Sequence, residues 1–243
     1  MEVQQVLEKN RTMHDMMCRA TVDALDLQQV AEQLHQLLQC SIYMIDKNGA
    51  LLGMKDSDAM QLFSVMELEE QHCCTETMQW LFHAQHPSYN QQCGDQYCSI
   101  VPVRNQNGQI GVLLCGQDTL MFDDTQMLLA EYGATLVAVM MMRAANRKAE
   151  TEARKKNVVQ LALEVLSYSE LEAVKYIFHE IDGNEGFLVA SKLAEEYKLT
   201  RSVIVNALRK LESAGVIDAR SLGMKGTYIK ILNDYLYEEL EVI

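Results

Sequence analysis

The stretch TRSVIVNALRKLESAGVI, from Thr200 to Ile217, is the part of the chain that decides its fold class. Its apolar residues recur every three or four positions, which predicts an amphipathic helix with one buried face. Thr200 is a residue type suited to cap the start of that helix, and Gly215 is suited to end it. The predicted buried face consists of Ile204, Ala207, Leu208 and Leu211.

The sequence on either side completes a recognisable order of elements. SKLAEEYKL (191–199) predicts a shorter helix that Ser191 caps, and Lys198–Thr200 form the turn between the two helices. SYSELEAVKYIFHEI (167–181) predicts a preceding helix, and VIDARS (216–221) and TYIKIL (227–232) predict two strands around the loop LGMKG. Helix, helix-turn-helix and β-hairpin in this order are typical of a winged helix-turn-helix.

The charge of this region favours DNA as its partner. Residues 191–230 contain eight Lys or Arg and four Asp or Glu, although the whole chain has a net charge of −13. We expect the second helix to enter the major groove, where Asn and Arg recognise base edges, while Ser, Thr and Lys contact phosphates. A winged helix used for protein contacts is the alternative. The predicted DNA-binding residues are Ser191, Lys192, Thr200, Arg201, Ser202, Val205, Asn206, Arg209, Lys210, Ser221 and Lys225.

The sequence of the first part of the chain predicts a small sheet covered by helices. Residues 3–22 and 27–38 have helical periodicity, whereas SIYMI-DKNG-ALLGM (41–54) and YCSIVPVR-NQNG-QIGVLLCG (97–116) each predict a β-hairpin. The segment 56–96 between the hairpins is expected to be helical and irregular. An antiparallel sheet of this kind indicates a sensor domain of the GAF or PAS type, which encloses one small molecule.

A long helix joins the two parts. From Asp123 to about Leu166 the chain contains no proline and one glycine, and the middle section RAANRKAETEARKKN (143–157) is charged almost all round. We place the domain boundary inside that section. The predicted fold class is α+β, with a GAF-like effector-sensing domain at 1–122, a linker helix at 123–166 and a winged helix-turn-helix at 167–243.

The segments ASKLAEEYKLTRSVIVNALRKLESAGVIDARSLGMKGTYIKILN (190–233), DGNEGFLVASK (182–192), VVQLALEVLSYSELEA (158–173) and LLAEYGAT (128–135) closely resemble the CodY family of transcriptional repressors of low-GC Gram-positive bacteria. The resemblance implies a homodimer with a GAF sensor domain, a linking helix and a winged helix. It also implies binding to an AT-rich pseudo-palindrome, and repression of metabolic and stationary-phase genes. Members sense branched-chain amino acids, and many also sense GTP.

The sensor region departs from the family pattern. SIVPV (99–103) resembles the family's pocket strand, so Ile100 and Pro102 are candidate effector contacts, and Lys47 is the one cation kept in the loop after the first strand. No Arg or Lys occurs between Asp56 and Pro102, although an amino-acid carboxylate needs a cation. Met140 and Ala145 stand where the resemblance places the nucleotide-binding acid and lysine. We therefore predict altered amino-acid sensing, no tight GTP binding and no cofactor.

A second hypothesis uses the thiols and imidazoles of the same region. His83-x₂-His86 and Cys93-x₄-Cys98 could each form half of a zinc site or a redox pair, in a transcription factor that senses metal or redox state; the alternative is that the cysteines are ordinary core residues. The candidate ligands are Cys73, Cys74, His83, His86, Cys93 and Cys98.

No phosphate-binding loop, zinc-protease motif or nucleophile elbow occurs, so no enzyme is predicted. The N-terminus is no signal peptide, and the longest apolar run, Leu136–Met142, is too short to span a bilayer, so we predict a cytoplasmic protein that does not bind membranes.

Overall fold

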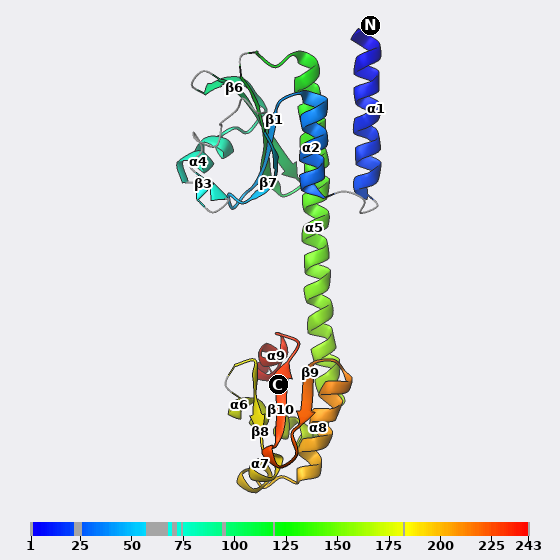
Figure 1. Cartoon of the computed structure of the whole chain (residues 1–243), viewed down its shortest axis with the longest axis vertical. Coiled ribbons are helices and arrows are strands. Elements are labelled where there is room, and N and C mark those ends of the chain that lie inside the picture. The colour runs from blue at the N-terminus through cyan, green and yellow to red at the C-terminus, as the bar shows by residue number, and fades with distance from the viewer. Residues whose placement is uncertain are drawn as a thin grey trace. The chain divides into compact units, whose positions relative to one another are not determined.

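The computed structural model describes residues 2–21, 26–56, 68–69, 72–73, 75–93, 96–118, 120–181 and 183–242. The chain forms two compact units, Met1–Ala145 and Asn146–Ile243 (Figure 1). The division lies inside the long helix α5 (Asp124–Glu164), within the charged stretch 143–157. Each unit therefore contains one end of the same helix, and each is described by itself below.

The first unit is built on a five-stranded antiparallel sheet. Its strand order is β2 (Leu51–Lys55), β1 (Ser41–Asp46), β7 (Gly108–Gln117), β6 (Gln96–Asn105) and β5 (Ser88–Cys93). Helices α2 (Leu27–Leu38) and α5 pack on one face of the sheet, with α1 (Glu2–Thr21) on their outer side, and α4 (Thr75–His83) packs on the other face (Figure 1). The two-residue strands β3 (Leu68–Glu69) and β4 (His72–Cys73) pair with each other.

Both faces of this sheet are covered, and the strand period separates two cores. Val101 and Leu113 are paired and face the α2 and α5 side, whereas their neighbours Ile100 and Leu114 are paired and face α4. Both predicted hairpins are confirmed. The segment predicted as helical and irregular also contains strand β5, which was not predicted. Its sequence SYNQQC is polar and lacks alternation, so its strand form depends on pairing with β6.

Helix α5 is apolar enough in its first part to resemble a membrane span. One 18-residue window has a mean hydropathy of 1.3, and 44% of that window is buried inside the protein. Leu129, Leu136 and Val137 from this part lie in the core of the first unit. Packing against the sheet and α2 thus accounts for part of this apolar composition.

The second unit contains the end of α5 and the predicted winged helix. Its elements are α6 (Tyr168–Glu180), β8 (Glu185–Leu188), α7 (Ala190–Glu196), α8 (Arg201–Ser213), β9 (Ile217–Ser221), the 3₁₀ turn η1 (Gly223–Lys225), β10 (Thr227–Ile231) and α9 (Leu236–Val242). The strands form a sheet in the order β8-β10-β9. The predicted face of α8 is buried, and Val159, Ala162 and Leu163 of α5 join the same core.

The ends of α8 follow the sequence prediction, but the start of α7 does not. The Thr200 side chain accepts a hydrogen bond from the Val203 N–H, and Gly215 adopts φ +70° as the chain leaves the helix. By contrast, α7 begins at Ala190, and Val189 precedes it without a side-chain cap. The prediction that Ser191 caps this helix is wrong, because the helix begins one residue before it.

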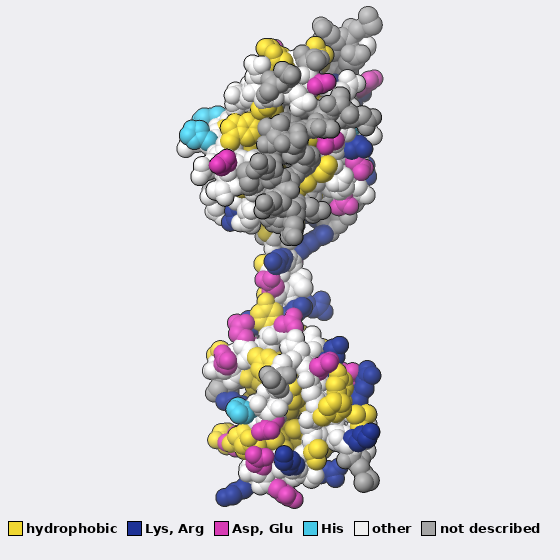
Figure 2. All heavy atoms as spheres, turned by 60° about the vertical axis from the view of Figure 1, so that its left-hand side comes forward, with side chains coloured by type: hydrophobic (Ala, Val, Ile, Leu, Met, Phe, Trp, Pro, Cys, Tyr) yellow, Lys and Arg dark blue, Asp and Glu magenta, His cyan; other side chains and the backbone are white. Residues whose placement is uncertain are grey.

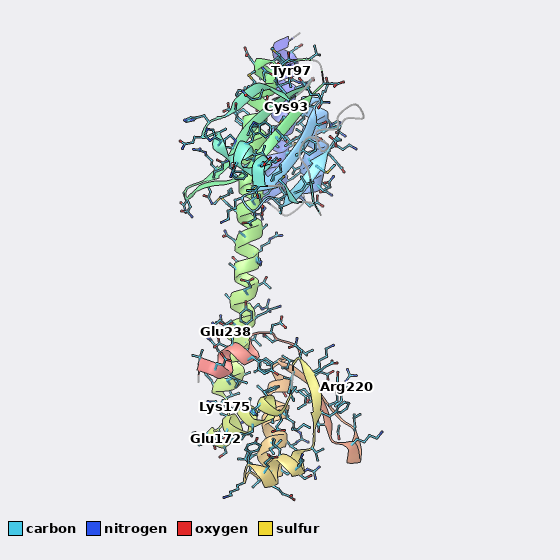
Figure 3. The ribbon with its side chains drawn as sticks, turned by 90° about the vertical axis from the view of Figure 1, so that its left-hand side faces the viewer. Cys93, Tyr97, Glu172, Lys175, Arg220 and Glu238 are labelled. Atoms are coloured by element: carbon cyan, nitrogen blue, oxygen red, sulfur yellow. The ribbon has the colours of Figure 1, made fainter. Side chains whose placement is uncertain are left out.

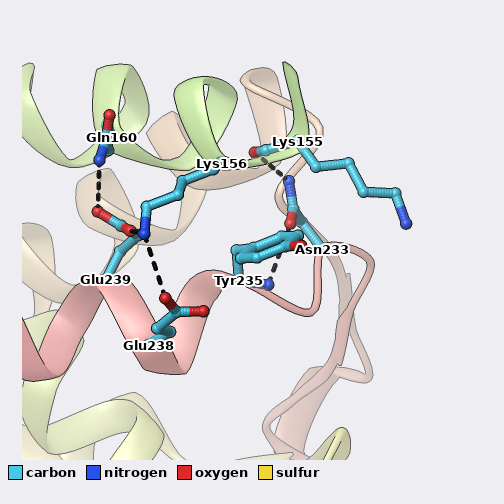
Figure 4. A network of polar contacts seen from close by, with 7 residues as sticks. All are labelled: Lys155, Lys156, Gln160, Asn233, Tyr235, Glu238 and Glu239. Carbon is cyan, nitrogen blue, oxygen red and sulfur yellow. Dashed lines mark hydrogen bonds and ion pairs between the residues drawn. The ribbon is translucent and has the colours of Figure 1, made fainter. Parts of the chain in front are cut away.

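Helix α9 was not predicted, and polar contacts fix it to α5 (Figure 4). Lys156 Nζ lies 3.0 Å from Glu239 Oε1, and Gln160 Nε2 donates to Glu239 Oε2 at 2.8 Å. The Asn233 side chain donates to the Lys155 carbonyl at 2.9 Å. Donation from Gln160, the larger cause, and from Lys156 lowers the pKa of the Glu239 carboxyl. These contacts make the last turns of α5 an integral part of the second unit.

Candidate nucleic-acid interface and sensor pocket

The helix-turn-helix is formed by α7, a turn at 197–200 and α8. Lys198 has a left-handed backbone with φ +55°, and the Leu199 N–H donates to the Ala194 carbonyl at 3.0 Å, which ends α7. The ring of Tyr197 stacks on Tyr176 of α6, with centroids 3.9 Å apart. The turn is therefore fixed both by its backbone and by packing on α6, and it directs the polar face of α8 outward.

A groove lies between the start of α7, the outer face of α8 and the β9–β10 wing. Its volume is about 540 Å³. Five predicted DNA-binding residues line it: Ser191, Arg201, Val205, Arg209 and Ser221. The remaining lining residues are Val189, Ala190, Leu208, Glu212, Ala219, Gly223, Gly226 and Thr227. Two guanidinium groups and three hydroxyls in one concave surface offer hydrogen-bond donors to base edges and phosphates.

Other predicted residues lie on the surface without lining this groove: Lys192, Thr200, Ser202, Asn206 and Lys225 are all exposed. Thr200 Oγ1 lies 3.0 Å from Ser202 Oγ, so the cap and its neighbour are already hydrogen-bonded at the start of α8. Lys225 ends the wing turn η1. Within the second unit, Lys and Arg side chains therefore occupy α7, α8 and the wing; Figure 2 shows basic side chains on one face of this unit.

Lys210 is the predicted residue whose position differs from the expectation. It was expected to face outward and contact phosphate, but its ammonium lies 2.6 Å from Glu170 Oε2 of α6 and 3.1 Å from the Val165 carbonyl. The same Glu170 oxygen accepts the Ser167 N–H at 2.7 Å and completes the cap of α6. Donation from Lys210, the larger cause, and from Ser167 holds the pKa of the Glu170 carboxyl below its usual range. Lys210 thus joins α8 to α6, although its side chain remains 40% exposed.

Two polar residues of the groove were missed by sequence reasoning. Glu212 lies on the face of α8 that carries Arg201 and Arg209, and Thr227 begins β10. The Ala219 N–H donates to Glu212 Oε1 at 3.4 Å, so this carboxylate connects α8 to the wing. The helical spacing from Arg201 was the available signal for Glu212. Arg220, labelled in Figure 3, is exposed on β9 and paired with Asp218 at 2.8 Å.

The candidate effector contacts are not brought together by the sensor unit. Ile100 lines a pocket of about 540 Å³ that α4 and β5 also form, whereas Pro102 lines a separate groove of about 380 Å³. Lys47 is exposed in the β1–β2 turn and lines neither of them. The groove beside Pro102 contains the cation Arg104, the second residue after the stretch without Arg or Lys.

The pocket around Ile100 is lined by aromatic and amide groups. Its residues are Gln79, Trp80, His83, Ala84, His86, Pro87, Ser88, Gln91 and Ile100. Histidine side chains lie beside exposed hydrophobic ones on this unit in Figure 2. On the same side of the sheet, the buried Tyr43 donates to Asp56, and burial is the main cause that raises the pKa of Tyr43. The pocket can therefore hold a small molecule through stacking and hydrogen bonds.

The metal hypothesis gains no support from the geometry. Among the described residues no group of three His, Cys, Asp or Glu side chains could hold a metal ion, and Cys74 lies outside them. His83 and His86 are exposed at the pocket rather than gathered with the cysteines. Cys73 is half-buried. One candidate half-site does come together, since the Sγ atoms of Cys93 and Cys98 are 2.6 Å apart.

Comparison with known proteins agrees across the chain. A family model of the CodY helix-turn-helix domain matches residues 184–243, and one of the CodY GAF-like domain matches residues 65–165. The global transcriptional regulator CodY of Clostridium acetobutylicum is 41% identical over 98% of this chain and 98% of its own length. That of Geobacillus kaustophilus is 42% identical over 97% of each. The GAF domain of the nutrient sensor CodY from Clostridium difficile aligns with 56% of this chain and 97% of its own, at 19% identity and a TM-score of 0.41.

These matches cover both units. The sequence identity to the two CodY regulators is well above the level at which a match indicates only a shared fold. The two family descriptions name a helix-turn-helix domain and a GAF-like domain, in agreement with the two kinds of fold described above. The chain belongs to the CodY family of global transcriptional regulators.

Proposed function

We propose that the chain is a repressor that binds an AT-rich pseudo-palindrome as a homodimer, with an affinity set by a metabolic small molecule in its sensor unit. The groove between α7, α8 and the wing is the observation that carries this proposal. It combines Arg201 and Arg209 with the hydroxyls of Ser191 and Ser221 on one exposed surface. A winged helix for protein contacts would instead present an apolar surface there.

In this proposal α8 enters the major groove. Arg201, Asn206 and Arg209 contact base edges, because guanidinium and amide groups can make paired hydrogen bonds to guanine and adenine. Ser202 and Lys225 contact phosphates on either side. The flanking residues Ser191, Lys192, Thr200, Val205 and Ser221 complete the interface. Lys210 is excluded from it, because its ammonium is bonded to Glu170.

A surface of the second unit supports the homodimer. Leu161 and Val165 are 62% and 63% exposed, and Tyr168 is 77% exposed. Leu161 lies in the last turn of α5, Val165 follows the end of that helix directly, and Tyr168 opens α6. Large apolar side chains in such a group are typical of a contact surface. A two-fold contact here would present two winged helices to the two halves of a palindrome.

The effector is proposed to occupy the pocket around Ile100 and Trp80. A branched-chain amino acid is the first candidate, by family resemblance, and tight GTP binding is not expected, since Lys47 stands apart from the described pockets. Binding would shift the dimer between arrangements that reach both half-sites and arrangements that reach one. No cofactor or membrane is part of this proposal, and the protein would act in the cytoplasm.

Fluorescence anisotropy on an AT-rich palindromic duplex and a scrambled duplex tests the proposal. Titrations would be made with and without isoleucine, leucine, valine and GTP. Preference for the palindrome, changed by one amino acid, is the expected result. Equal binding to both duplexes would overturn the target-site proposal. If the protein prefers the palindrome but none of the four ligands changes that preference, the proposed amino-acid effector is refuted and the proposed DNA site stands.

Two variants separate base contacts from phosphate contacts. Arg201→Ala should lose the preference for the palindrome, whereas Lys225→Ala should weaken binding to both duplexes and lower the salt slope by about one. Lys175→Ala, an exposed residue of α6, is the control and should bind as the wild type does. Wild-type specificity in Arg201→Ala would show that α8 does not read the bases.

A further inference from the structure

The hairpin of β5 and β6 holds two cysteines whose sulfur atoms are in contact, one of them half-buried and one buried. Cys93 Sγ and Cys98 Sγ are 2.6 Å apart. In the strand register Cys93 is opposite Gln96, and Cys98 is opposite Gln91. Because side chains alternate along a strand, Cys98 projects on the same face as Gln96. Cys93 and Cys98 are therefore diagonal cross-strand neighbours, an arrangement in which side chains can touch.

The two thiols differ in their access to solvent. Cys98 is fully buried in the core that also contains Leu81 of α4, whereas Cys93 is half-buried. Cys93, the last residue of β5, is labelled in Figure 3. The hydrogen bond between the thiols lowers the pKa of Cys93, while the same contact raises the pKa of Cys98. Cys93 is thus the thiol that can meet a dissolved oxidant as a thiolate, and Cys98 is the protected thiol next to it.

We propose that Cys93 and Cys98 form a site of reversible oxidation, in which a peroxide converts the two thiols into a disulfide across the β5–β6 hairpin. The Cys93 thiolate attacks one oxygen of hydrogen peroxide, the O–O bond breaks, and Cys93 becomes a sulfenic acid as hydroxide leaves. Cys98 sulfur then attacks the Cys93 sulfur, the S–O bond breaks, and a second water is released after proton transfer. Two thiols are oxidised and one peroxide is reduced to two waters.

The disulfide would constrain β5, an edge strand whose pairing with β6 is interrupted. The register between β5 and β6 is irregular between Ser88 and Gln91, and Asn90 has φ +54°. Ser88 and Gln91 also line the pocket around Ile100. A covalent bond from Cys93 to β6 therefore fixes the strand that forms one wall of this pocket. This consequence adds a chemical input to the sensor unit and does not depend on which effector binds.

Peptide mapping of the full-length protein tests the site directly. Asp95 lies between the two cysteines in the sequence, so a protease that cleaves before Asp separates Cys93 from Cys98 unless a disulfide joins their fragments. Reduced protein would be treated with hydrogen peroxide, alkylated, digested without reductant and analysed by tandem mass spectrometry, which locates the bonded cysteines within fragments 58–94 and 95–117. The expected result is a linked pair of fragments, two hydrogen atoms lighter than their sum, that dithiothreitol separates.

Matched variants decide between this bond and random oxidation. Cys93→Ser should abolish the linked pair, and Cys98→Ala should do the same while leaving Cys93 as a sulfenic acid that dimedone labels. Cys18→Ser removes an exposed thiol of α1 and should leave the linked pair unchanged. Circular dichroism would check that each variant is folded. Oxidation of Cys93 to sulfinic acid in the wild type, without a link to Cys98, would overturn the proposal, as would equal linkage of Cys93 to Cys73.

A second measurement tests the effect on the edge strand. Amide hydrogen exchange over Ser88–Gln92 should slow after oxidation of the wild type, and peroxide should leave it unchanged in Cys93→Ser. Unchanged exchange in wild-type protein that carries the linked pair would show that the bond forms without fixing β5, and would refute this consequence.

Discussion

Replacing Lys210 by methionine tests whether the recognition helix α8 is held by an internal ion pair. The ammonium of Lys210 bonds the Glu170 carboxylate at 2.6 Å and the Val165 carbonyl at 3.1 Å. The Glu170 side chain is 9% exposed and that of Lys210 is 40% exposed, so the pair lies between a buried and a surface ion pair. Methionine keeps most of the apolar stem of lysine and removes only the charge.

The expected loss of unfolding free energy depends on which hydrogen bonds Glu170 retains after the substitution. After the substitution it still accepts the Ser167 N–H, so its cap of α6 survives, but its nearest cation is gone. A hydrogen bond to a charged group contributes about 1.5–3 kcal/mol, and exposure of Lys210 favours the lower part of that range. We expect the second unit to lose about 2 kcal/mol of unfolding free energy, which lowers its melting temperature by roughly 8–16 °C.

The assay must report the second unit alone. The single tryptophan, Trp80, lies in the first unit, so its fluorescence follows that unit during urea unfolding. Pulsed hydrogen exchange with mass spectrometry, read on fragments from α6 and α8, follows the second unit. The urea midpoint of these fragments should fall in Lys210→Met while the Trp80 midpoint stays. Lys175→Met, an exposed residue of α6, is the matched control and should match the wild type.

Two outcomes would refute the reasoning. A Lys210→Met protein as stable as Lys175→Met would show that the ion pair contributes nothing to the second unit. If the same variant instead lost DNA affinity and lowered the salt slope, Lys210 would contact phosphate, as its sequence position first suggested. A double-mutant cycle with Glu170→Gln adds a check, because a real contact requires non-additive effects on stability.

Three further predictions concern the same unit. Lowering the pH through the depressed pKa of Glu170 should erase the stability difference between wild type and Lys210→Met, because stability from a depressed acid is present above its unfolded pKa and is lost as the pH falls through its folded pKa. Urea midpoints of both proteins, measured in steps from pH 7 down through the acidic range, follow this loss. Gly226→Ala should destabilise the wing by about 1–3 kcal/mol, since φ is +98° and a Cβ would lie 2.4 Å from the Leu188 carbonyl oxygen; Gly183→Ala, also at positive φ but with nothing near its Cβ, is the control in thermal melts. Asn233→Ala should cost about 1–2 kcal/mol by removing the donor to the Lys155 carbonyl, read as faster exchange in α9.

Each of these has a contradicting result. A stability difference that persists at low pH would place the effect of Lys210 elsewhere than on Glu170. Equal melting temperatures for Gly226→Ala and Gly183→Ala would mean that the wing relaxes around the added methyl group. Unchanged exchange in α9 of Asn233→Ala would show that packing alone holds this helix on α5.

The sequence by itself determined the elements whose signals are local. The periodicity of Ile204, Leu208 and Leu211, with a cap at Thr200 and a glycine after the helix, was enough to place α8 and its buried face. The two hairpins were equally readable, because alternating apolar strands surround short turns rich in Asn and Gly. The family resemblance then supplied the order of the domains and the expectation of DNA binding.

Elements without a local pattern were decided only by tertiary structure. Strand β5 has a polar sequence and exists through pairing with β6, and α9 is a short helix held by contacts with α5. A short helix lacks the length to show a period, and an edge strand need not alternate. Neither could be predicted, because the partners that stabilise them are distant in the sequence.

The same limit applies to individual side chains. Lys210 looked like an outward cation beside Arg209, yet Glu170, forty positions earlier, binds it. Cys93 and Cys98 could be seen as a spaced pair, but only the strand register places their sulfur atoms in contact. Ile100, Pro102 and Lys47 were selected from sequence motifs as candidate effector contacts, but in the folded sensor unit they do not line one common pocket. Periodicity and caps act between residues close along the chain, so the sequence specified them; ion pairs, thiol contacts and pockets join residues that only folding brings together.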